Sequence, residues 1–205
     1  MSLPRGFKAW CENVALQIRR ELGLAQTARL DPRQLASHLD IEVRTPYDIP
    51  GLDQSCIRRL VTEDSGSWSA VTLSSGEKDL VLVNPSHSRG RQANDLMHEL
   101  AHILLGHEAA RVDVAEDGSL VLFTYDKEQE DEANWLAACL LLPRAALLAI
   151  RKEGGDLHAS AREYGVSQAM LQYRLNVTGV EHQMGQTTRR AVNRGISTHP
   201  KSVGD

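Results

Sequence analysis

Apolar residues near the N-terminus recur at spacings of three and four, which is the pattern of one buried face of a helix. The series is Phe7, Trp10, Cys11, Val14, Ile18 and Leu22. We expect this first helix to end near Gly23. A second helix should begin at Pro32, because Asp31 is a suitable N-cap and proline fits the first helical position.

The helical pattern disappears between Pro46 and Asn84, where short β-type runs are separated by turns that contain Gly and Ser. These runs are residues 57–61, 68–73 and 80–83, and an extended segment precedes them at 41–43. The pattern predicts a small antiparallel sheet.

Helical spacing returns over residues 91–106, where four apolar residues form a stripe. They are Leu96, Leu100, Ile103 and Leu104. Asp126 followed by Gln129 has the pattern of a capping box, which predicts a further helix over 127–142. Pro143 ends that helix and can open the next one. A small sheet packed against helices is an α+β fold, with a helical C-terminal part.

The length of 205 residues fits one domain, which we place at residues 1–180. Its predicted parts are a helical segment 5–40, the sheet 41–84, two central helices 91–106 and 127–142, and a helical end 144–176. Residues 181–205 contain almost no large apolar side chains, so we expect a flexible tail there.

Charge and cysteine content bear on the expected partners and cellular location more than on the fold. The net charge is −4 with both signs interspersed, which argues against a dedicated binder of nucleic acid or anionic membranes. The cysteines Cys11, Cys56 and Cys139 lie far apart among apolar neighbours, as expected of buried free thiols. The N-terminus lacks the apolar core of a signal peptide, and the apolar stretch 133–150 is interrupted by polar residues and proline. We therefore expect a cytoplasmic protein.

Candidate chemistry lies on the helix 91–106. His98 and His102 are four residues apart, so both imidazoles project from one face and can reach one metal ion. Glu99 is adjacent to His98, where its carboxylate can act on water at the metal without filling the coordination shell. This H-E-x-x-H pattern predicts a zinc peptidase with Glu99 as general base. The alternative is two ordinary helix histidines beside an exposed glutamate.

A catalytic zinc site needs a third protein ligand and one open position. The helix 127–142 offers Glu128, Glu130 and Glu132, but successive members point about 200° apart and cannot serve together. Glu130 falls on the inner edge of the apolar face, whereas Glu132 lies farther toward solvent. We therefore expect Glu130 to be the ligand, with the other two favouring the helix dipole.

Two segments resemble the ImmA/IrrE family of zinc metallo-endopeptidases. They are LVLVNPSHSRGRQANDLMHELAHILLGH at 80–107 and EDEANWLAACLLLP at 130–143. The resemblance implies metal ligands His98, His102 and Glu130, a catalytic Glu99 and a Zn²⁺ cofactor. The sequence departs from the family pattern at Trp135, where members usually carry Phe. This substitution changes packing only. In order of elements the likeness extends over about residues 31–175.

The resemblance also implies a substrate, because family members typically cleave a helix-turn-helix transcriptional repressor, often one encoded beside them. The expected role is thus that of an anti-repressor. We expect residues 80–83 at the edge of the sheet, where an extended substrate segment can dock. His158 and Tyr173 are candidate donors to the reaction intermediate, although packing roles are commoner for such residues. His107 follows the motif, but its five-residue offset from His102 should turn it away from the metal face.

Two other functions fit parts of the sequence. Residues 157–175 have the spacing of a helix-turn-helix, which would make the protein a DNA-binding regulator with a structural or inactive metal site. The recognition helix would offer only Arg174 as a cation, so we expect no direct binding of nucleic acid. Two histidines and a carboxylate can also hold non-haem iron, but the adjacent Glu99 favours zinc.

Overall fold

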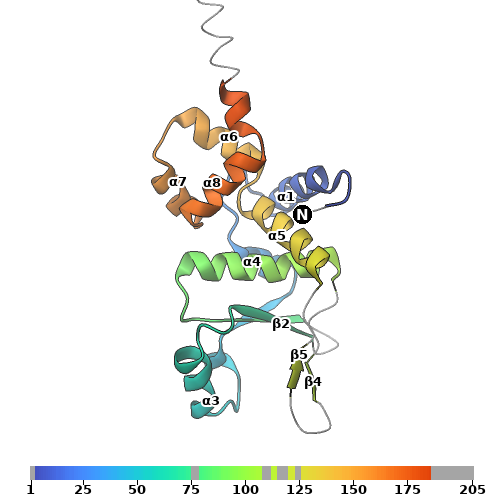
Figure 1. The fold of residues 1–205 in the computed structure, drawn as a ribbon, viewed down its shortest axis with the longest axis vertical. Helices are drawn as coiled ribbons and strands as arrows, with labels where there is room; N and C mark the ends of the chain where they lie inside the picture. The colour runs from blue at the N-terminus through green and yellow to red at the C-terminus, as the bar shows by residue number, and fades with distance from the viewer. Residues whose placement is uncertain (1–2, 75–78, 108–111, 115–119, 123–125, 186–205) are drawn as a thin grey trace, which may run out of the picture.

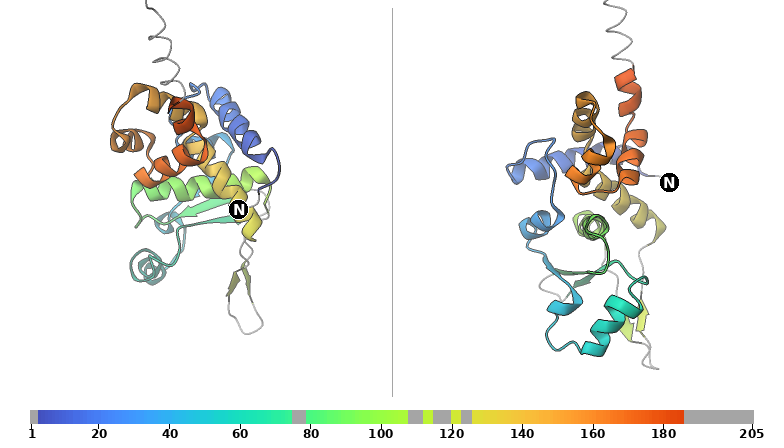
Figure 2. Two further views of the ribbon diagram at one scale, coloured as in Figure 1. Left: turned by 45° about the horizontal axis from the view of Figure 1, so that its top comes forward. Right: turned by 90° about the vertical axis from the view of Figure 1, so that its left-hand side faces the viewer.

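Helix α4, Arg89–Leu105, runs through the middle of the molecule, with a sheet on one side and most of the other helices on the other (Figure 1). The right-hand view of Figure 2 shows α4 end-on between these two layers. The structure, a computed structural model, describes residues 3–74, 79–107, 112–114, 120–122 and 126–185. Within these residues the α+β class predicted from the sequence is confirmed.

The sheet has three strands in the order β1-β3-β2. They are β1 Glu42–Arg44, β2 Ala70–Ser74 and β3 Asp79–Val83. Strand β2 pairs with β3 antiparallel, but β1 pairs with β3 parallel, so the expectation of a wholly antiparallel sheet is wrong. A parallel pair needs a long connection, and the residues between β1 and β3 supply one.

The central position of β3 corrects a second expectation. Residues 80–83 were expected at an edge of the sheet, yet β3 has β1 on one side and β2 on the other. Its backbone groups are occupied on both sides, so it cannot accept a substrate strand. Within the part of the chain that the structure describes, β1 and β2 are the two edge strands, one on each side of β3.

The predicted strand at residues 57–61 is wrong, because this segment is helical. Helix α3, Gln54–Arg58, continues into a π-helical turn, Arg59–Glu63, called η2. The Asp53 side chain accepts a hydrogen bond from the Ser55 backbone N–H and caps α3. Ile57 and Val61 are four residues apart, a spacing that puts two residues on the same side of a helix as well as of a strand.

The remaining helices lie, to within one residue, in the segments predicted to be helical. They are α1 Phe7–Glu21, α2 Pro32–His38, α5 Lys127–Leu141, α6 Arg144–Glu153, α7 Leu157–Tyr164 and α8 Gln168–Val177. A 3-10 turn, η1, covers Pro46–Asp48, and a hairpin pairs β4 Val112–Val114 with β5 Leu120–Leu122. The local capping chemistry explains this agreement, since Asp31 caps α2 and the capping box of Asp126 and Gln129 opens α5.

The core lies where α5 packs between α1 and α4. Leu136, Leu140 and Leu142 are fully buried there, together with Leu100 of α4. The buried Arg19 guanidinium donates to the carbonyl oxygens of Ala15, Ala28 and Leu140, which ties α1 to the end of α5. These contacts hold α5 between α1 and α4.

The C-terminal region extends the predicted domain. Residues 180–185 are helical, and Arg151 pairs with Glu181 at 3.0 Å, so the helical part reaches into the segment predicted as a tail. Residues 186–205 of that predicted tail lie outside the described residues. Cys11 and Cys139 are buried free thiols as expected, but Cys56 on α3 is exposed.

No single described helix has the length and apolar character of a membrane span; α5 and α6 reach it only when taken together, and they are bent by 46°.

Candidate metal centre

Three possible ligands come from two helices that cross in the core. His98 and His102 lie one turn apart on α4, which packs directly against α5. Glu130 lies in the first turn of α5, directly after its capping box. Because the cap fixes where α5 begins, it also fixes the position of the Glu130 carboxylate opposite the two imidazoles.

The donor atoms of these residues converge. Nε2 of His98 lies 3.1 Å from Nε2 of His102 and 3.2 Å from Oε2 of Glu130. Nε2 of His102 lies 3.6 Å from Oε1 of Glu130. A tetrahedral zinc ion with bonds of about 2.0–2.1 Å places its ligand atoms roughly 3.3 Å apart. The spacing and the chemistry of this donor set therefore fit zinc.

The electrostatics of His102 also suit a metal ligand. Its side chain is fully buried. Burial, with a smaller contribution from the neighbouring His98 and His107, lowers the pKa of His102 to about 3. The ring is therefore neutral near pH 7 and keeps a lone pair for a cation, as metal binding requires.

Glu99 lies between the three-residue cluster and the sheet. It is only 8% exposed, and its Oε2 accepts a hydrogen bond of 2.6 Å from the Thr72 hydroxyl of β2. Burial raises the pKa of Glu99, and the hydrogen bond from Thr72 opposes this in part. The group of possible ligands comprises His98, His102 and Glu130, so Glu99 remains available as a base beside them.

Sequence reasoning missed two residues behind His102. Nδ1 of His107 lies 2.8 Å from Nδ1 of His102, and Nε2 of His107 lies 3.3 Å from Oε2 of Glu132. The five-residue offset would turn His107 away only in a continuing helix, but α4 ends at Leu105 and Gly106 adopts a left-handed φ of 68°. The chain reverses there, which returns the His107 ring to His102. Glu132, expected toward solvent, is only 24% exposed.

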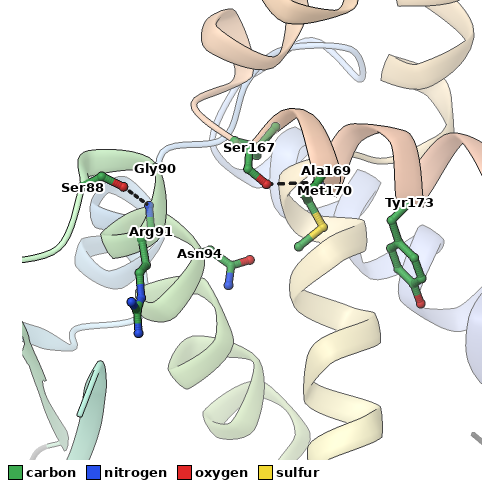
Figure 3. Close-up of a pocket in the computed structure, with 9 residues that line it drawn as sticks. Ser88, Gly90, Arg91, Asn94, Ser167, Ala169, Met170 and Tyr173 are labelled. Atoms are coloured by element: carbon green, nitrogen blue, oxygen red, sulfur yellow. Dashed lines mark hydrogen bonds between the residues drawn. The ribbon is translucent and has the colours of Figure 1, made fainter. Parts of the chain in front are cut away.

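The two candidate donors to the reaction intermediate, His158 and Tyr173, lie on α7 and α8. His158 is exposed on α7. Tyr173 of α8 lines a cavity of about 620 Å³ between α8 and the start of α4 (Figure 3). Asn94 lines the same cavity one turn before His98, so the cavity flanks the part of α4 that carries His98 and His102. Neither His158 nor Tyr173 belongs to the three-residue cluster.

The helix-turn-helix spacing is realised in α7 and α8, which contact each other. However, Arg174 is fully buried, and its Nη2 lies 2.6 Å from Oε1 of Glu12 in α1. The only cation of the predicted recognition helix is therefore used inside the protein and cannot contact a DNA phosphate. This burial removes the main support for the DNA-binding alternative.

Among the comparisons with known proteins, a family match covers this site. A search among curated proteins found no match. A solved structure of a Mycobacterium tuberculosis transcriptional regulator aligns with 84% of this chain and 47% of its own, at 14% identity and a TM-score of 0.44. This chain thus spans about half of that regulator's length. Residues 57–176 match the IrrE N-terminal-like domain, Peptidase_M78, and include every residue of the cluster. Since the match covers more than half of the sequence, the chain belongs to the IrrE N-terminal-like peptidase family.

Proposed function

We propose that the protein is a zinc-dependent metallo-endopeptidase with His98, His102 and Glu130 as metal ligands. The observation that carries this proposal is the convergence of three ligand atoms within 4.8 Å of one another, beside a buried carboxylate. Membership of a peptidase family supports it. An iron site would use the same three ligands, but it would leave the buried Glu99 without a role.

In this proposal Glu99 moves the proton. A bound zinc ion would lower the pKa of a water molecule and polarise the substrate carbonyl. Thr72 holds Oε2 of Glu99, which leaves Oε1 to accept the proton as the water attacks the peptide. The same oxygen can then return that proton to the leaving amine. The raised pKa of Glu99 suits both steps, because the acid and the base forms are then closer in free energy.

The edge of β2 is the proposed docking surface for the substrate. Thr72 of β2 contacts Glu99 directly, so this strand lies alongside the site. An extended peptide that pairs with β2 would place its carbonyl groups along the ligand-bearing face of α4. This replaces the expected position beside residues 80–83, which lie in the central strand.

The first prediction concerns metal content. Purified protein should hold one zinc ion per chain, and His98→Ala, His102→Ala and Glu130→Ala should each lose it, because two ligands seldom retain zinc. Glu128→Ala is the matched control, since Glu128 is exposed in the same turn of α5 as Glu130. Elemental analysis gives the answer. Zinc retained in all three ligand variants would exclude the proposed site.

The second prediction concerns the substrate. By its resemblance to ImmA/IrrE proteins, the enzyme should cut one helix-turn-helix repressor encoded beside it, at an exposed extended segment. Mixing the two proteins should yield discrete fragments in mass spectrometry, and a chelator should prevent them. Casein should be cut slowly. Rapid digestion of many unrelated proteins would indicate a general peptidase instead.

A further inference from the structure

We propose that His107 and Glu132 form a positioning pair that fixes the His102 ring in the one tautomer able to bind the metal. This inference rests on the proposed zinc site. It assigns a role to two residues outside the ligand set, and it depends on the hydrogen bonds behind His102.

The direction of these hydrogen bonds follows from the chemistry of the partners. An ionised carboxylate only accepts, so Glu132 requires a proton on Nε2 of His107. In a neutral His107 ring, Nδ1 is then an acceptor, and at 2.8 Å it requires a proton on Nδ1 of His102. Nε2 of a neutral His102 is left with its lone pair. That atom faces Nε2 of His98 and the Glu130 carboxylate.

The surroundings hold the pair in place. The side chains of His102 and His107 are 0% and 8% exposed, so water has little access to the hydrogen bond between them. The left-handed Gly106 brings His107 back to His102, and the His107 backbone N–H donates to the His102 carbonyl oxygen at 3.0 Å. Both the ring and the backbone of His107 are thus attached to the residue that it positions.

The other histidine ligand lacks this support. Nδ1 of His98 is buried, and it has no hydrogen-bond partner within the described part of the chain. Partners of this kind typically account for a factor of 10–100 in metal affinity. His102 is therefore the pre-oriented ligand, and the His107–Glu132 pair should contribute to zinc affinity through it.

The test compares Glu132→Gln, His107→Phe and the double variant with Glu128→Gln, which removes an exposed charge from the same helix. Glutamine can donate as well as accept, so it allows the hydrogen bonds to run in the opposite direction and to place a proton on Nε2 of His102. Phenylalanine fills the space of His107 but forms no hydrogen bond. Both variants should bind zinc about 10- to 100-fold more weakly, by competition with a chromophoric chelator. Glu128→Gln should bind as the wild type does.

The double variant separates positioning from simple attraction between charges. If Glu132 acts only through His107, adding Glu132→Gln to His107→Phe should weaken zinc binding no further. Multiplied effects in the double variant would show that the Glu132 charge attracts zinc directly, and would overturn the proposal. Unchanged affinity in both single variants would do the same.

A second readout needs no metal. In nitrogen NMR spectra of the metal-free protein, His102 should carry its proton on Nδ1, and Glu132→Gln should produce a mixture of tautomers. This also shows whether each variant is folded. Wild-type protein that binds no zinc would overturn the proposed function and this inference together, whereas tight binding by wild type and variants alike would overturn only the positioning role.

Discussion

Replacing Glu99 with Gln should strongly slow cleavage of the proposed repressor substrate while leaving the zinc content unchanged. The amide cannot take up a proton, and loss of a general base typically lowers turnover by about 10²- to 10⁴-fold. The metal should remain, because Glu99 is outside the cluster of His98, His102 and Glu130. The appropriate measurements are kcat on the repressor and zinc content in the same preparations. Undiminished cleavage in this variant would exclude the proposed mechanism.

The same variant should be at least as stable as the wild type near pH 7 when both are free of metal. Burial raises the pKa of Glu99, so the folded state disfavours the ionised form that predominates above the usual pKa of a glutamate. A neutral amide removes this penalty and can still accept the hydrogen bond from Thr72. Thermal unfolding checks this, and a clear loss of stability would attribute the loss of cleavage to misfolding instead.

The largest effect on stability is expected from Glu12→Ala. Glu12 pairs with the fully buried Arg174 at 2.6 Å, and its second oxygen accepts the backbone N–H of Arg144 at 2.8 Å. Removing one partner of a buried ion pair leaves the other charge uncompensated, which costs about 3–5 kcal/mol. The free energy of unfolding in urea should fall by that amount.

An exposed ion pair provides the control for this change. Glu63 lies 3.2 Å from Arg58, and these side chains are 55% and 76% exposed. Glu63→Ala should therefore change the free energy of unfolding by only about 0–1 kcal/mol. A loss from Glu12→Ala as small as this would show that Arg174 reaches solvent, which would also reopen the DNA-binding alternative.

Local chemistry allowed most helices to be predicted. Side-chain caps such as Asp31 and Asp126 act within three residues, so their effect can be read from a short stretch of sequence. The H-E-x-x-H spacing acts within one helix for the same reason. The strand predicted at residues 57–61 is wrong because two branched residues at a spacing of four suit either a strand or a helix. The cap at Asp53 is the local signal that favours the helix.

Features that depend on distant segments were not predictable in this way. The pairing of β1 with β3 joins residues 38 apart, such as Glu42 and Leu80, and no local pattern records it. The contact between Thr72 and Glu99 also depends on how the sheet packs on α4. The position of His107 did have a local signal in Gly106, because a glycine often ends a helix and reverses the direction of the chain.

The edge of β2 also affects how copies of the protein behave toward one another. Within the described residues, β3 pairs with one side of β2 and no strand pairs with the other. Unpaired backbone groups accept any extended chain, so β2 of a second molecule can compete with the substrate. With five residues, β2 is short, which keeps such pairing weak. If the substrate pairs with β2 as proposed, the same edge is one through which crowded copies of the chain would inhibit each other.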